Sequence, residues 1–190
     1  MASNPNYFND VLLDLTERGQ LLRREPARQK ISEEYGVYSI FIDTPVALPE
    51  CFNVELNKRA TNLLYVGQAQ CQSLRTRLIQ QDLSGIGNST FFRGVGAILG
   101  YRPESGSLHG KKNQNNYVFT QDDKKKIVDW IDTFIQIRWH VITETNVIND
   151  CEKHLINELY PLLNWKHNPR KFKPLEELRK ECREIAKSAN

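Results

Sequence analysis

The spacing of apolar residues along the chain predicts three β-strands. Two are short and lie close together in the first part of the chain, and the third comes much later. The predicted strands are residues 36–42, 63–66 and 135–143. In the third strand apolar and polar side chains alternate, which is the period-two pattern of a strand with one buried face. Because the first two strands are neighbours in sequence, we expect them to pair in an antiparallel way.

Apolar residues recur every three or four positions elsewhere, which predicts helices. The first helix is amphipathic, and we expect it to cover one face of the sheet and to end near Pro26. Ser73 and Thr120 occupy positions where helix N-caps are expected. Residues 43–60 contain prolines and asparagines and are predicted to form an irregular loop with room for one helical turn. The predicted helices are residues 7–24, 73–82, 90–101, 120–134, 146–160 and 175–186.

The composition is that of a soluble globular protein. Of the 190 residues, 39% are hydrophobic and 26% are charged, and the length suffices for one domain with a good core. No apolar run approaches the roughly 18 residues that span a bilayer, so we expect no membrane partner. The first residues lack the basic and apolar regions of a signal peptide, which predicts a cytoplasmic protein. The four cysteines are widely spaced without a Cys-x-x-Cys motif, which predicts reduced thiols and no structural zinc.

Basic residues are clustered, although the formal net charge is only +3. A net charge of this size does not by itself indicate nucleic acid, and solvated surface charge is the competing interpretation of each cluster. One cluster lies in the most polar segment, residues 102–116, which is either a mobile surface loop or a contact surface for a polyanion. The residues that we predict to contact nucleic acid are Arg75, Lys111, Lys112, Lys166, His167, Arg170 and Lys171.

Two predicted strands each carry a tyrosine close to a glycine. Tyr38 lies in the first strand and Tyr65 in the second, and a helix that contains Arg75 and Arg77 follows. A helix that begins just after a strand directs its amide groups and its first-turn side chains at whatever lies above the sheet, an arrangement that favours anions. Two phenols and a guanidinium brought together would suit a phosphate group.

The tripeptides Gly-Val-Tyr at residues 36–38 and Tyr-Val-Gly at residues 65–67 resemble the pair that names the GIY-YIG nuclease family. The resemblance covers about residues 35–168 and implies an α/β (α+β) fold, with a small, mostly antiparallel three-stranded sheet flanked by helices. It also implies that the protein is an endonuclease that hydrolyses nucleic-acid phosphodiesters with one divalent cation, Mg²⁺ or Mn²⁺. An arginine, a glutamate and an asparagine complete the family's pattern in the expected order, and the candidates here are Arg77, Glu152 and Asn164.

The resemblance also implies a role for each of these side chains. Glu152 would be the metal ligand, since Mg²⁺ accepts a single carboxylate together with waters and phosphate oxygens. Arg77 would hold the scissile phosphate and offset the charge that develops in the transition state. Tyr38 and Tyr65 would position or deprotonate the attacking water. Asn164 would tie the active-site backbone together or orient water.

Several alternatives remain open at the level of sequence. Arg75 competes with Arg77 for the phosphate, and Glu152 could instead cap its own helix. Many family members carry a histidine or tyrosine one helical turn after the arginine, whereas Gln81 stands there and cannot act as a base. The general base is therefore either one of the two tyrosines or a lysine.

The chain is predicted to form a single domain, residues 1–190. An N-terminal helical segment, residues 1–34, and a C-terminal helix, residues 170–190, flank the core. The core is predicted to contain a helical and loop insertion at about residues 85–134. The basic loop of that insertion is the first candidate for a DNA contact surface.

The first functional hypothesis is a metal-dependent DNA endonuclease, with RNA as a substrate that the sequence does not exclude. The alternative is a non-catalytic nucleic-acid-binding module on the same fold, and a structural protein without a nucleic-acid partner ranks third. Cutting two strands with one active site per chain would favour a homodimer.

Overall fold

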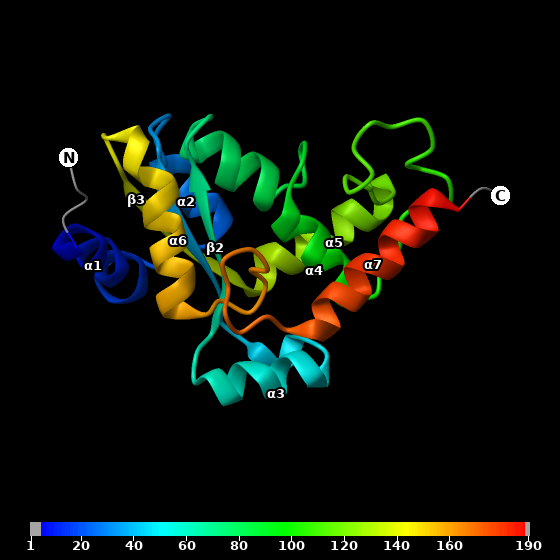
Figure 1. Cartoon of the computed structure of the whole chain (residues 1–190), viewed down its shortest axis with the longest axis horizontal. Coiled ribbons are helices and arrows are strands. Elements are labelled where there is room, and N and C mark those ends of the chain that lie inside the picture. The colour runs from blue at the N-terminus through cyan, green and yellow to red at the C-terminus, as the bar shows by residue number, and fades with distance from the viewer. Residues whose placement is uncertain (1–4, 189–190) are drawn as a thin grey trace.

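The computed structural model describes residues 5–188, and three strands form its only sheet within that range (Figure 1). Residues 1–4 and 189–190, the outer ends of the predicted terminal segments, lie outside the described range. The strand order is β2-β1-β3, and both pairings are antiparallel. This confirms the predicted α/β (α+β) fold with an antiparallel three-stranded sheet. The strands are β1 (Gly36–Ile42), β2 (Leu63–Ala69) and β3 (Ile135–Val141).

Strand β2 is longer than predicted because it continues through Gly67 to Ala69. Gly67 lies opposite Tyr38 on β1. A β-carbon at position 67 would come within 2.4 Å of the Tyr38 ring. The glycine therefore allows the strand to pass the buried phenol without ending there.

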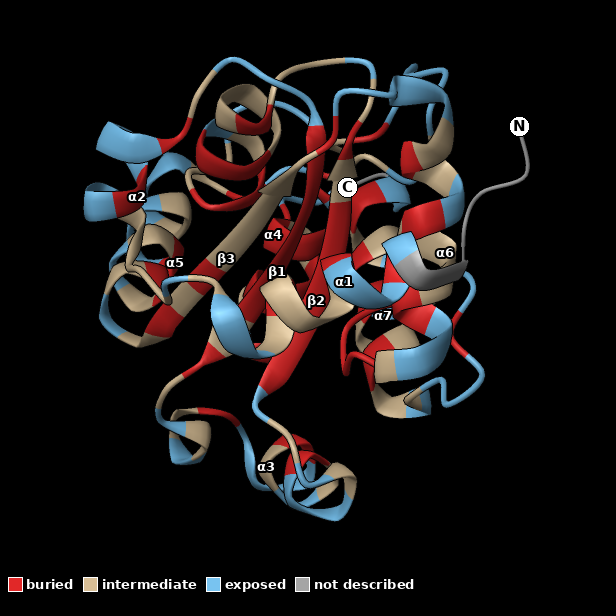
Figure 2. Cartoon of the chain, turned by 90° about the vertical axis from the view of Figure 1, so that its left-hand side faces the viewer, coloured by how far each residue is buried: buried red, intermediate tan, exposed pale blue. Residues whose placement is uncertain are grey.

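Helices cover both faces of the sheet (Figures 1 and 2). On one face, α1 (Pro5–Leu13) continues as a π-helical turn (Asp14–Arg18) and packs with α6 (Ile148–Leu159), as predicted for the first helix. These elements enclose a smaller apolar cluster that includes Val11, Val37 and Leu155. The larger cluster lies on the other face, beneath α4 (Thr90–Ile98), α5 (Gln121–Phe134) and α7 (Lys173–Lys187).

The helix predicted over residues 7–24 is shorter, and a second helix begins only at Arg24. The first ends at Arg18, and Leu22 then exchanges two backbone hydrogen bonds with Ile137 at the outer edge of β3, with lengths of 3.1 and 2.8 Å. A separate helix, α2 (Arg24–Lys30), follows. Pro26 lies in the first turn of α2, where a residue without an N–H group is tolerated. The expectation that Pro26 marks a helix end was therefore wrong.

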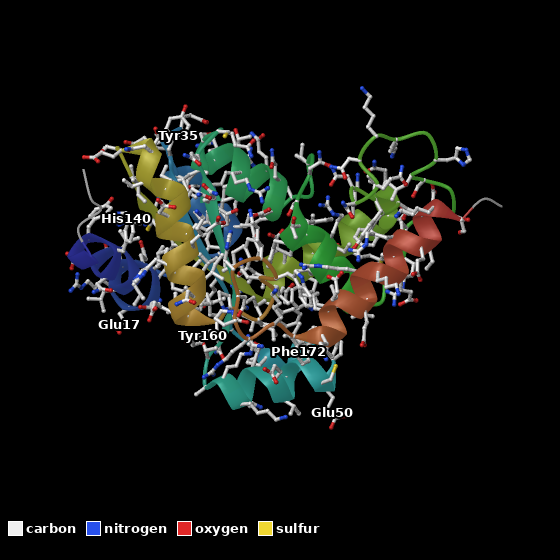
Figure 3. All side chains as sticks on the ribbon, in the orientation of Figure 1. Glu17, Tyr35, Glu50, His140, Tyr160 and Phe172 are labelled. Atoms are coloured by element: carbon white, nitrogen blue, oxygen red, sulfur yellow. The ribbon has the colours of Figure 1, made fainter. Side chains whose placement is uncertain are left out.

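The prediction of an irregular loop at residues 43–60 was also wrong. A short 3₁₀ turn (Pro45–Ala47) leads into a ten-residue helix, α3 (Glu50–Arg59). Phe52 and Leu56 lie one turn apart on α3 and are both buried. The ring of Phe52 contacts that of Phe172 at the start of α7, with 5.0 Å between ring centroids (Figure 3). Burial of these two side chains stabilises a helix that its asparagines and prolines obscure in the sequence.

The other predicted helices are present with small changes in their ends. The arginine-bearing helix (Arg75–Asp82) has π-type hydrogen bonding, and Ser73 Oγ accepts a bond of 3.2 Å from Thr76 N. Thr120 Oγ1 caps α5 by accepting from Asp123 N. A 3₁₀ turn (Thr145–Val147) precedes α6. No helix in the described part of the chain is both long and apolar enough to cross a membrane.

Candidate active site

The two tyrosines of the paired tripeptides lie on neighbouring strands, and both belong to the larger apolar cluster. Tyr38 is fully buried and Tyr65 is 8% exposed. Burial raises the pKa of Tyr38 well above its usual value, and the nearby Asp82 carboxylate raises it further. Burial likewise raises the pKa of Tyr65, against the smaller lowering effect of Arg77. Both phenols are therefore protonated near neutral pH.

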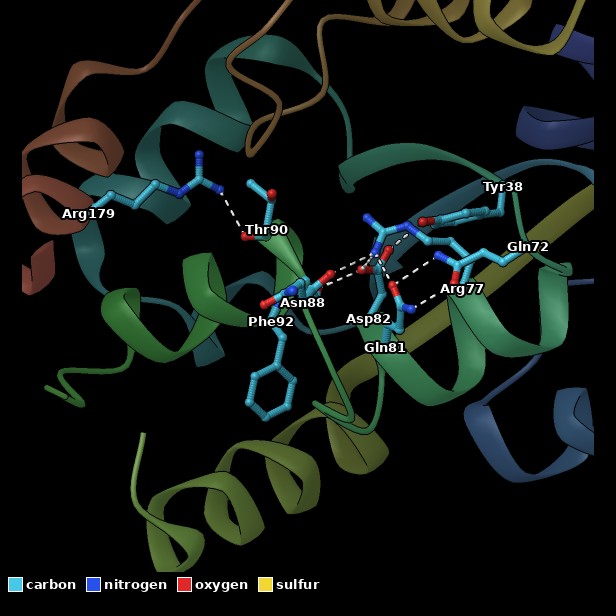
Figure 4. A network of polar contacts seen from close by, with 10 residues as sticks. Tyr38, Gln72, Arg77, Gln81, Asp82, Asn88, Thr90, Phe92 and Arg179 are labelled. Carbon is cyan, nitrogen blue, oxygen red and sulfur yellow. Dashed lines mark hydrogen bonds and ion pairs between the residues drawn. The ribbon is translucent and has the colours of Figure 1, made fainter. Parts of the chain in front are cut away.

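A buried carboxylate that the sequence reasoning missed organises this region (Figure 4). Asp82 ends the arginine helix and is completely buried. It accepts a short hydrogen bond from Tyr38 Oη and one of 2.5 Å from Ser89 Oγ, and it pairs with Arg77 at 3.2 Å. The available signal was its spacing, because Asp82 stands four residues after buried Leu78 on the apolar face of the helix.

Arg77 is held by several contacts besides Asp82. Its Nη1 donates to Gln81 Oε1 at 2.8 Å and to Asn88 O at 3.1 Å, and the side chain is 17% exposed. Burial alone would lower the pKa of Arg77, but Tyr38, Asp82 and Tyr65 more than offset it, so the guanidinium stays charged. Gln81, at the position one helical turn after Arg77, thus orients the arginine.

The competing arginine turns away from this region. Arg75 Nε lies 3.3 Å from Glu33 Oε1, and Arg75 Nη2 donates to Arg28 O at 2.9 Å. Only Arg77 of the pair lines the cleft that also contains Glu152. The structure therefore places Arg77, rather than Arg75, in the same cleft as the glutamate.

Glu152 and Arg77 line one open cleft of about 310 Å³. Glu152 lies on α6, and Gln68 Nε2 on β2 donates to its Oε2 at 3.0 Å. Burial raises the pKa of Glu152 to about 7, although Gln68, Arg77 and Lys166 favour the ionised form. The carboxylate therefore ionises close to neutral pH. The remaining lining residues are Gln70, Cys71 and Gln72.

Asn164 joins the loop after α6 to the outer edge of β2. Its Oδ1 accepts from Val66 N at 2.9 Å, and its Nδ2 donates to Val66 O at 2.8 Å. The preceding residue extends this pairing, since Leu163 N donates to Leu64 O at 2.7 Å. The edge strand that carries Tyr65 is thereby covered, and its backbone groups are satisfied.

A second cleft, of about 360 Å³, opens on the other side of Glu152. Tyr65, Asn164, Lys166 and His167 line it together with Glu152. Besides Glu152, four of the predicted catalytic and nucleic-acid-binding side chains thus line this second cleft. Side chains that the sequence did not single out also line it, namely Thr90, Arg93, Asn115, Tyr117, Ile156, Leu163, Trp165, Glu176, Arg179 and Arg183.

The other predicted contact residues line neither of these two clefts. Arg170 stacks over the Tyr160 ring at 4.4 Å and Lys171 lies 5.4 Å from the centre of the Trp165 ring. Lys111 and Lys112 are exposed on the loop between α4 and α5. That loop is bound to the end of α7 by the hydrogen bond from Leu108 N to Ala186 O, which is 2.8 Å long.

The residues around Glu152 fit a hard divalent cation with few protein ligands. Among residues 5–188, no group of three or more histidine, cysteine or acidic side chains could hold a metal. A cation at Glu152 would therefore be completed by waters and phosphate oxygens, as Mg²⁺ permits. Gln68 Oε1, beside the carboxylate, is buried without a hydrogen-bond partner, so one further oxygen is available next to Glu152.

Residues 36–184 match the family of the GIY-YIG catalytic domain. The match spans well over half of the chain, and the chain belongs to this family. Membership implies a nuclease-type function in general; nucleases of the family generally depend on a divalent metal and act on DNA. No curated protein and no solved structure matches the chain.

Proposed function

We propose that this chain is a divalent-metal-dependent endonuclease that hydrolyses phosphodiester bonds of DNA. The observation that carries the proposal is the placement of Glu152 and Arg77 in one open cleft, where a carboxylate with a pKa of about 7 and a guanidinium held by Asp82 and Gln81 line the same space. A carboxylate can hold a cation and a guanidinium can bind a phosphate oxygen, and both interactions stabilise the charge that develops during metal-dependent phosphodiester hydrolysis.

Each side chain has a separate task in this proposal. Glu152 holds the Mg²⁺ or Mn²⁺ ion, which when bound would polarise the phosphate and lower the pKa of a coordinated water. Arg77 binds a nonbridging oxygen of the scissile phosphate and stabilises the charge that builds up there. Asp82 acts as a positioning residue, since it keeps the Arg77 guanidinium in place without reaching the cleft itself.

The two phenols act as hydrogen-bond donors in this proposal, because their raised pKa values leave them protonated. The Tyr38 hydroxyl already donates its proton to Asp82, so Tyr38 helps to hold Asp82 in place and does not contact the substrate. Tyr65, which lines the second cleft, is the phenol that can reach a water or a phosphate oxygen. Asn164 keeps the backbone beside Tyr65 in register through its two bonds to Val66.

The test is the relaxation of supercoiled plasmid with Mg²⁺, Mn²⁺ or EDTA, with single-stranded RNA as a second substrate. Glu152→Ala is expected to abolish metal-dependent cleavage while DNA binding persists. Glu158→Ala is the matched control, because Glu158 is an exposed carboxylate on the same helix. Unchanged cleavage by Glu152→Ala would refute the metal assignment.

A non-catalytic nucleic-acid-binding module is the second candidate function. Gln81 in place of a basic or phenolic group, together with two protonated tyrosines, leaves these positions without a general base. Binding of DNA with steep salt dependence, without any nicking in either metal, would support this candidate over the first. Nicking confined to one strand would count against the homodimer that concerted cleavage of two strands suggests.

A further inference from the structure

Two arginines that the proposed cleavage step does not use line the second cleft. Arg93 lies on α4 and Arg179 on α7, two helices that pack against each other. Both side chains face the space that also contains Tyr65 and Glu152. They come from segments far apart in the sequence, which the packing of α7 against α4 brings together (Figure 1).

Arg179 is buried, with 6% of its surface exposed. Its Nη2 donates a long hydrogen bond of 3.3 Å to Thr90 O (Figure 4) and a second of 3.3 Å to Leu163 O. Its Nε is buried with no partner. A buried guanidinium normally pairs with a carboxylate, because an uncompensated charge in the interior is costly. No ion pair involving Arg179 is present among the described residues.

The packing of α4 makes room for this unpaired group. A β-carbon at Gly94 would lie 2.7 Å from Arg179 Nη2. Glycine in the middle of a helix costs stability relative to alanine. The close approach of the guanidinium to the backbone of α4 therefore depends on a residue that is otherwise unfavourable there.

Arg93 is likewise without a protein anion. Its guanidinium lies 5.8 Å from the centre of the Tyr117 ring, and among the described residues it forms no ion pair and donates no side-chain hydrogen bond. Burial lowers its pKa, and the neighbouring Arg179 and Arg77 lower it further, against the raising effects of Tyr117 and of the more distant carboxylate of Asp82, which is already paired with Arg77. Two guanidinium groups thus line the same partly enclosed cleft, where the positive charge of each disfavours the charged form of the other.

The carboxylates that face the second cleft do not neutralise this pair. Glu176 is bonded to Arg183 at 2.7 Å. Glu152 accepts from Gln68 and lies at the boundary with the first cleft. An external anion would supply the missing partner, and planar guanidinium groups match the oxygens of a phosphate.

We propose that Arg93 and Arg179 form a second phosphate site, which binds the phosphodiester next to the one held by Arg77. The strand would pass over Glu152 from the first cleft into the second, where Lys166 and His167 line the wall. This inference rests on the nucleic-acid substrate of the proposed function, but it does not require cleavage. Arg93 and Arg179 are binding residues that set the position of the strand.

The experiment measures the affinity of a labelled DNA duplex by fluorescence anisotropy over a series of salt concentrations. The parent protein and all variants carry Glu152→Gln, and all samples contain EDTA, so that the duplex stays intact. Arg93→Gln is the principal variant because its guanidinium bonds to no other described side chain. Arg179→Lys is the second, and Lys180→Gln is the matched control, since Lys180 is exposed on the same helix and pairs only with Glu184.

We expect Arg93→Gln to weaken binding about tenfold, the loss typical of one charged hydrogen bond. The slope of log affinity against log salt concentration should also fall by about 0.9 for the lost phosphate contact. Arg179→Lys should weaken binding as well, because a lysine lacks the planar fork, and Lys180→Gln should match the parent. Thermal unfolding shows whether each variant is folded. If Arg179→Lys does not fold, the binding of Arg93→Gln alone decides whether the second phosphate site exists.

Binding by Arg93→Gln that equals the parent in affinity and in salt slope would overturn the second phosphate site, even if the wild-type protein cuts plasmid. A parent that binds no nucleic acid at low salt would overturn it as well, together with the proposed function. Weaker binding by the variants would support the site even if the wild-type protein produces no nicks. The two proposals therefore fail by different results.

Discussion

Replacing Glu152 with glutamine should make the metal-free protein more stable above neutral pH. The pKa of Glu152 is about 7 in the folded protein against 4.5 for an unperturbed glutamate, mainly because the group is buried. Between these two values the folded protein keeps a proton that the unfolded chain has lost. Stability therefore falls as the pH rises through this interval, and the loss is complete above about pH 7.

The size of this loss follows from the two pKa values. At about 1.4 kcal/mol for each pH unit, the interval corresponds to about 3 kcal/mol. Glutamine has nearly the same shape and cannot ionise, and its carbonyl oxygen can still accept the hydrogen bond from Gln68 Nε2. Glu152→Gln should therefore stabilise the protein by about 3 kcal/mol at about pH 8, and by little at about pH 4.5.

Urea unfolding in EDTA at these two pH values measures the effect. Glu158→Gln is the control, because Glu158 is exposed on the same helix and should change the free energy of unfolding little at either pH. Mg²⁺ should stabilise the wild-type protein at the higher pH and leave Glu152→Gln unaffected, since ligand binding to the folded state adds to its stability. A Glu152→Gln protein that is no more stable than wild type at the higher pH would refute the reasoning.

Three further predictions concern the framework of the site. Asp82→Ala removes the acceptor of the Tyr38 hydroxyl and leaves the largely buried Arg77 without its carboxylate partner, so the free energy of unfolding should fall by about 3 kcal/mol or more; a urea titration that shows less than about 1 kcal/mol would contradict this. Asn164→Leu should cost about 2 kcal/mol and speed amide exchange at Val66, and an unchanged exchange rate would show that the bonds are dispensable. Gly67→Ala places a β-carbon 2.4 Å from the Tyr38 ring and should lower the melting temperature; an equal melting temperature would mean that the ring moves freely.

The strands and most helices could be predicted because their signals are local. Residues 135–141 alternate with period two, and the structure confirms a strand there. Helix α3 escaped prediction because only Phe52 and Leu56 carry its apolar signal, and the partner that buries Phe52 is Phe172, more than a hundred residues later. The first helix was predicted to be too long because Leu22 continues its apolar spacing. Leu22 instead pairs with Ile137 at the edge of the sheet.

The site shows the same division. The order of tyrosines, arginine, glutamate and asparagine is visible in the sequence, and it predicted the family to which the chain belongs. The choice between Arg75 and Arg77 is not visible, because both lie in the first turn of one helix and differ only in what surrounds them. Glu33 is the partner of one and Asp82 of the other, and both partners are set by packing.

By itself the sequence determined the kind of fold and the residue types of the site, since strand periodicity and motif order are properties of the chain alone. Tertiary structure decided which charges meet. Helix α7 packs against α4 and brings Arg179 into the cleft that Arg93 also lines, and the arginine helix places Asp82 within hydrogen-bond distance of Tyr38. Electrostatic interactions between side chains depend on distance and burial rather than on sequence separation, so the pKa of Glu152 and the unpaired arginines emerged only when the chain was folded.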